Sequence, residues 1–70
     1  LGARSGFTAA QTAADIAARE LSRAERLFAA GGLAERDLEN ARRGDLSARS
    51  MLDDARARLS QAEKARDAAN

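Results

Sequence analysis

Apolar residues in the first half of the chain recur at alternating steps of four and three, and mostly polar or small residues lie between them. This spacing keeps one stripe of a helix facing a partner helix, as in a coiled coil. Thr8 and Gln11 match a capping box, an arrangement that starts many helices. We therefore expect a lead-in segment over residues 1–7 and a helix over residues 8–30. The stripe consists of Ala10, Ala14, Ala17, Leu21, Ala24 and Phe28.

The second half of the chain repeats this pattern after a pair of glycines. Gly31 stands where a helix C-terminus favours a left-handed residue, and Gly32 gives the chain freedom to reverse its direction. We expect a turn over residues 31–34 and a second helix over residues 35–68, because short connections join antiparallel helices. The stripe of this helix, interrupted by Asp45 and Arg66, consists of Leu38, Ala41, Ala48, Leu52, Ala55, Leu59 and Ala62. The predicted fold is all-α, a two-helix antiparallel coiled-coil hairpin over residues 8–70.

Two large apolar residues are adjacent at the end of the first predicted helix. Leu27 and Phe28 point in different directions on a helix, so both cannot face the same partner. Phe28 fits the spacing of the stripe. We therefore expect Phe28 in the seam between the helices and Leu27 displayed near the tip of the hairpin, beside Arg23 and Leu33.

Composition and charge reduce the number of functions that the chain could have. The 70 residues include no cysteine and no histidine, so thiolate and imidazole ligands and an imidazole general base are absent. Twelve basic and eleven acidic residues are interspersed, which gives a net charge of +1 and no basic block of the kind that binds nucleic acid. We expect no enzyme activity, no cofactor, no metal and no nucleic-acid partner. Function should then reside in contacts with other proteins.

The segment LSRAERLFAAGGLAERDLENA, residues 21–41, resembles the α-helical hairpin of periplasmic adaptor proteins, also called membrane fusion proteins. In that family the hairpin tip carries an arginine, a leucine four residues later and a serine seven residues after that, and this triad docks on an outer-membrane exit duct. Arg23 and Leu27 match the first two positions, and Ala34 stands in place of the serine. Without the hydroxyl, Ala34 cannot cap the second helix through its side chain. The resemblance implies partner-binding residues at the tip, namely Arg23, Leu27, Gly31, Gly32, Leu33 and Ala34.

The same resemblance implies a place in the cell and a set of partners. It predicts a structural hairpin in the periplasm of a Gram-negative cell, as part of a tripartite efflux pump or a type I secretion system. The tip would meet the outer-membrane duct, sister hairpins would pack side by side, and other parts of a longer adaptor chain would meet the inner-membrane transporter. The chain begins Leu1-Gly2, and we expect it to be part of such a longer chain. A generic coiled-coil scaffold or oligomerisation module has the same stripe and remains the alternative.

Overall fold

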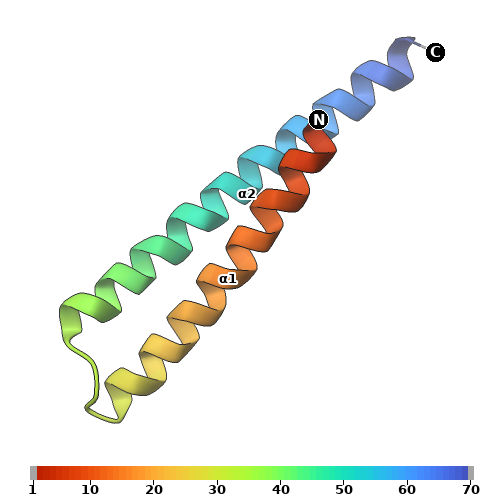
Figure 1. The fold of residues 1–70 in the computed structure, drawn as a ribbon. Coiled ribbons are helices and arrows are strands. Elements are labelled where there is room, and N and C mark those ends of the chain that lie inside the picture. Colours follow the sequence, from red (N-terminus) through yellow and green to blue (C-terminus); the bar gives the residue numbers. More distant parts are fainter. Residues whose placement is uncertain (1, 70) are drawn as a thin grey trace.

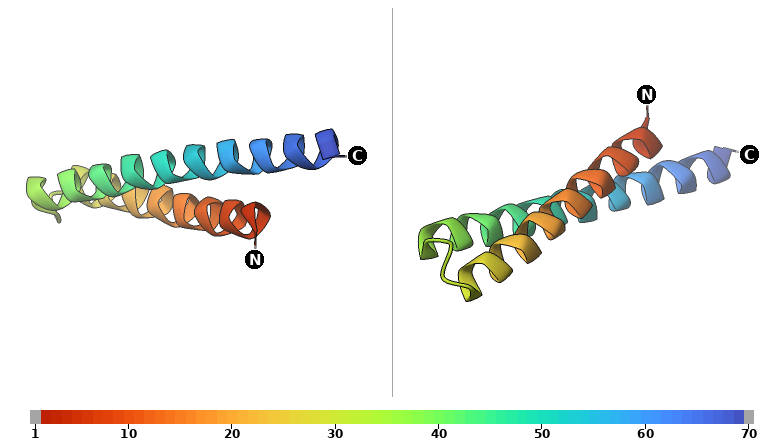
Figure 2. Two further views of the ribbon diagram at one scale, coloured as in Figure 1. Left: turned by 90° about the horizontal axis from the view of Figure 1, so that it is seen from above. Right: turned by 60° about the horizontal axis from the view of Figure 1, so that its bottom comes forward.

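Two helices joined by a short loop make up the fold, which is all-α as expected (Figure 1). The computed structural model describes residues 2–69. Helix α1 spans Ala3–Ala29, and helix α2 spans Glu35–Ala69 and returns alongside α1. The hairpin measures 58 × 15 × 13 Å, so it is a rod two helices wide. Figure 2 shows that the two helices cross at a shallow angle and that α2 continues past the N-terminal end of α1.

The first helix begins at Ala3, and the expected start at Thr8 is wrong. The Thr8 hydroxyl donates a hydrogen bond to the Arg4 carbonyl at 3.1 Å, which is a bond to the preceding turn inside a helix rather than a cap. The helix extends back to Ala3 because Ala3 and Phe7 continue the seam spacing toward Ala10 and are themselves partly buried. The lead-in expected over residues 1–7 is therefore helical from Ala3 onward, and Leu1 lies outside the described residues.

Contacts from α2 support this N-terminal turn of α1. The Arg4 guanidinium lies 4.0 Å from the Glu63 carboxylate, and the Arg56 guanidinium carbon lies 6.0 Å from the centre of the Phe7 ring. Both contacts are at or near the surface, so each contributes at most about 1 kcal/mol to the free energy of unfolding. They show that the extra turns of α1 lie beside α2 as far as Glu63, whereas the last turn of α2 continues beyond α1.

The register of the hairpin can be followed in the alanines along the seam. The following pairs line common hollows: Ala3 with Ala62, Ala10 with Ala55, and Ala24 with Ala41. Small side chains let helix axes approach closely, but they return little hydrophobic free energy on burial, because that term scales with apolar area. Ala14, Ala24 and Leu38 are the buried apolar residues among those described. The seam therefore fixes alignment more than it builds a core.

Asp45 is the buried charged residue of this seam in the described part of the chain, with 3% of its surface exposed. One carboxylate oxygen, Oδ2, accepts from Arg49 Nε at 3.1 Å, while Oδ1 has no hydrogen-bond partner among the described residues. The alanine register places Asp45 level with residues 20 and 21 of α1. The predicted interruption of the stripe is thus a carboxylate held inside the seam.

Candidate functional site

The loop at the tip begins with a Schellman motif that ends α1. The Gly32 N–H donates to the Leu27 carbonyl at 2.8 Å, and the Gly31 N–H donates to the Phe28 carbonyl at 3.0 Å. Gly31 has a φ of 81°, where a side chain would be strained. A Cβ on Gly32 would lie 3.6 Å from the Leu27 carbonyl oxygen, an ordinary contact. Gly31 is therefore the residue that the reversal requires, and Gly32 is not.

The second helix begins without a side-chain cap at its first residue. The Ala34 carbonyl accepts from the N–H groups of Asp37 at 3.0 Å and Leu38 at 3.2 Å, so Ala34 occupies the N-cap position. Its methyl group cannot accept a hydrogen bond from the first turn of α2. Glu35 and Asp37 place negative charge in that turn, where the helix dipole favours it. The two ends of the loop therefore differ: the end of α1 is fully capped and the start of α2 is not.

A hollow of about 340 Å³ lies on one flank of the hairpin just above this loop. Residues from both helices and the loop line it: Glu20, Arg23, Ala24, Leu27, Leu33, Asp37 and Ala41. The lining thus combines two alanines of the seam with one guanidinium, two carboxylates and two leucine side chains. Arg23 forms no ion pair with another described residue. The hollow thus offers an unpaired cation beside apolar surface, a combination suited to a protein partner.

The structure brings three of the six expected tip residues together. Arg23, Leu27 and Leu33 line the hollow. Gly31, Gly32 and Ala34 shape the loop behind it without lining it. The expectation that Leu27 is displayed near the tip is met, since 43% of its surface is exposed.

The matching expectation for the neighbouring phenylalanine is wrong. Phe28 is 41% exposed although it fits the seam spacing. It lies in the last turn of α1, which ends at Ala29, so no further turn of α1 covers the ring. The exposed ring adds apolar surface close to the tip.

Two acidic residues of the hollow were not expected. Glu20 precedes Arg23 by three positions and Leu27 by seven, so helical spacing alone places it on the same flank. Asp37 reaches the hollow from the first turn of α2, and its position depends on the register between the helices. Spacing within one helix is therefore a signal for Glu20, whereas Asp37 requires the tertiary structure.

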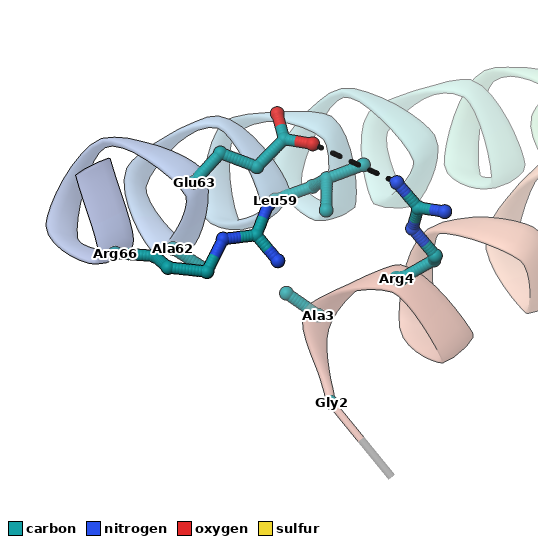
Figure 3. A pocket seen from close by; sticks show the side chains of 7 residues that line it. All are labelled: Gly2, Ala3, Arg4, Leu59, Ala62, Glu63 and Arg66. Atoms are coloured by element: carbon teal, nitrogen blue, oxygen red, sulfur yellow. Dashed lines mark ion pairs between the residues drawn. The ribbon is translucent and has the colours of Figure 1, made fainter. Parts of the chain in front are cut away.

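Two further hollows lie away from the tip. One, of about 320 Å³, is at the open end of the hairpin, where Arg4 and Glu63 form their ion pair over Leu59, and Ala3 lies beside them (Figure 3). Arg66 reaches toward the same hollow from the last turns of α2. The other, of about 610 Å³, lies between Gly6 of α1 and Met51 of α2, nearer to the open end than the tip hollow. Neither is lined by any of the six residues expected at the tip.

Neither α1 nor α2 is long and apolar enough to cross a lipid bilayer. Comparisons with protein-family models, with curated proteins and with solved structures found no match to this chain.

Proposed function

We propose that the hairpin is the docking element of a periplasmic adaptor and that its tip binds an outer-membrane exit duct. One observation carries this proposal: Arg23 and Leu27, at the spacing of the adaptor motif, lie with Leu33 in an exposed hollow beside the loop. Coiled-coil residues that serve packing alone would face the seam. These three side chains instead line a surface hollow, where another protein can reach them.

The chemistry of the hollow suits docking by a loop or helix end of the partner. A guanidinium presents several N–H donors in a fixed plane and binds carboxylates or backbone carbonyls, which collect at helix C-termini. Leu27 and Leu33 supply apolar area that gains free energy when water leaves. The flanking carboxylates of Glu20 and Asp37 would discourage a strongly acidic partner surface.

The rod shape fits a connecting role in the proposed assembly. Its 58 Å length would carry the tip toward the duct while the open end of the hairpin joins the rest of the adaptor. Sister hairpins would pack beside it, and the inner-membrane transporter would meet other parts of the parent chain. The proposed location is the periplasm of a Gram-negative cell. The proposed role is structural, without catalysis.

Charge reversal and polar substitution at the tip test this function in the parent protein. Arg23→Asp and Leu27→Ser should abolish export by the host, measured as tolerance to expelled toxic compounds and as protein secreted into the medium. Both positions are at the surface, so the hairpin should stay folded by circular dichroism.

Matched controls lie on α2, away from the hollow. Arg43→Asp reverses an exposed charge, and Leu46→Ser removes an exposed leucine. Arg49 is unsuitable as a control because it pairs with the buried Asp45. Export that survives both tip changes, or that is lost equally with the control changes, would refute the proposed role.

A further inference from the structure

Helix α1 carries a second series of residues, beside the seam, at steps of three and four. The series runs Ala13, Ile16, Glu20, Arg23, Leu27 and the C-cap residue Ala30, and all six residues are exposed. Ile16, with 53% of its surface exposed, protrudes from the middle of the helix. Glu20, Arg23 and Leu27 line the tip hollow, so the series follows the same flank of the hairpin.

This series has the same chemistry when it is read from either end. A small residue is followed by a large aliphatic residue and a charge, and then the order reverses: charge, large aliphatic, small. The two charges at the centre, Glu20 and Arg23, have opposite sign. A twofold axis between them, with the two helices antiparallel, pairs like with like at the apolar positions and unlike charges at the centre. The pairs across this axis are Ala13 with Ala30, Ile16 with Leu27, and Glu20 with Arg23.

We propose that this face of α1 binds a second copy of the chain in that antiparallel arrangement. Ile16 of each copy would enter the hollow of about 340 Å³ beside Leu27 of the other copy. Glu20 and Arg23 have no ion-pair partners among residues 2–69 of their own chain, so both charges are available for the contact. A parallel arrangement would place the Glu20 residues of the two chains side by side, and likewise the two Arg23 residues. Repulsion between these like charges disfavours it.

The proposed contact is small and should be weak. The series spans about 26 Å at about 1.5 Å per residue, which is one face of one helix. Such an interface is at the low end of the size range of specific protein contacts, so we expect monomer–dimer exchange at micromolar to millimolar concentration. The contact does not depend on the proposed adaptor function. Because it covers Arg23 and Leu27, it excludes any other partner at the tip while it lasts.

Sedimentation of charge variants over a concentration series tests the pairing. Glu20→Arg and Arg23→Glu should each lower the association constant at least tenfold, because each places like charges across the axis. An equimolar mixture of these two variants should associate, since all charges across the axis are then opposite. The double variant with both changes should associate like the natural chain. Leu46→Asp, which changes an exposed leucine of α2, should leave association unchanged.

Disulfide formation tests the antiparallel orientation. The chain has no cysteine, so each disulfide would report on introduced residues. A mixture of Ala13→Cys and Ala30→Cys chains should form heterodimers on mild oxidation, whereas Ala13→Cys alone should not, because the two Ala13 positions would be about 26 Å apart.

Several outcomes would overturn the proposal. These are a monomer at every concentration, association that is indifferent to the charge changes, and cross-linking of Ala13→Cys with itself. Sedimentation and cross-linking use this chain alone, so they are independent of whether the tip binds a duct.

Discussion

Ala34 and Gly31 show how single residues at the loop set the character of the tip. Gly31, with its φ of 81°, completes the hydrogen bonding at the end of α1. Ala34 begins α2 and leaves N–H groups of the first turn without a side-chain acceptor. The loop therefore has more hydrogen bonds at the end of α1 than at the start of α2.

Restoring a hydroxyl at the start of α2 should stabilise the hairpin. Ala34→Ser supplies an acceptor for the N–H groups of the first turn, and we expect a gain of about 1 kcal/mol in the free energy of unfolding. Thermal or urea unfolding measures the gain. The matched control is Ala30→Ser, the same change on the other side of the loop, where the backbone is helical and the hydroxyl caps nothing. Equal effects of the two changes would mean that Ala34 is not the cap.

At the scale of the helices, the spacing of the seam residues predicted the two helices correctly, whereas the capping motif predicted the wrong start for α1. Alternating steps of three and four, with a glycine pair between them, were enough to predict two antiparallel helices and their approximate ends. The same spacing extends back through Phe7 to Ala3, yet Gly2, Gly6 and the Thr8–Gln11 motif suggested a later start. Local capping signals are worth about 1 kcal/mol, and burial along the seam outweighed them here.

The early start of α1 predicts the effect of removing a glycine. Gly6 lies inside α1, and a Cβ there would meet nothing within 4 Å. Gly6→Ala should therefore stabilise the hairpin by about 1 kcal/mol, the difference in helix propensity between the two residues. Gly2→Ala, at the N-cap position, should give no gain, since alanine caps poorly. If Gly6→Ala leaves the melting temperature unchanged, then residues 3–7 are not helical in solution.

Because Asp45 is buried in the seam, we expect the natural hairpin to be less stable than a variant with an apolar residue at this position. Its carboxylate is buried with Oδ1 unpaired among the described residues, and burying a polar atom without a partner costs about 1–3 kcal/mol. Asp45→Leu should raise the free energy of unfolding by a similar amount, because Arg49, with 66% of its side chain exposed, stays hydrated without its partner. Asp53→Leu is the control, since this carboxylate is exposed and the change should be within about 0.5 kcal/mol. Loss of stability in Asp45→Leu would contradict this reading of the seam.

A polar residue in the seam also bears on specificity. One buried polar residue at a seam position can fix the register of a coiled coil at a cost in stability. The sequence revealed Asp45 as an interruption of the stripe, but its burial follows from the neighbouring alanines, which keep the two helices close.

The candidate site at the tip was likewise predictable only in part. Arg23 and Leu27 were expected at the tip, and helical spacing could also have placed Glu20 on their flank. The contribution of Asp37 and the exposure of Phe28 depend instead on where α2 begins and α1 ends.

At the scale of the whole molecule, the hairpin is a slender rod without a substantial core. Two helices in contact along one alanine-rich seam bury little apolar area, so the free energy of unfolding should be small. A molecule of this shape has much surface for its length, and the proposed docking site occupies one end of it. Binding at the proposed docking site would then add to the stability of the hairpin.

The measurement that tests the proposed docking most directly is site-specific photo-crosslinking in the intact cell envelope of the host. A photoreactive residue at position 27 of the parent protein should capture an outer-membrane duct protein, identified by mass spectrometry. The same residue at position 46, on an exposed part of α2, should not capture it. Capture at position 27 of only cytoplasmic proteins, only further copies of the chain, or no protein would contradict the account.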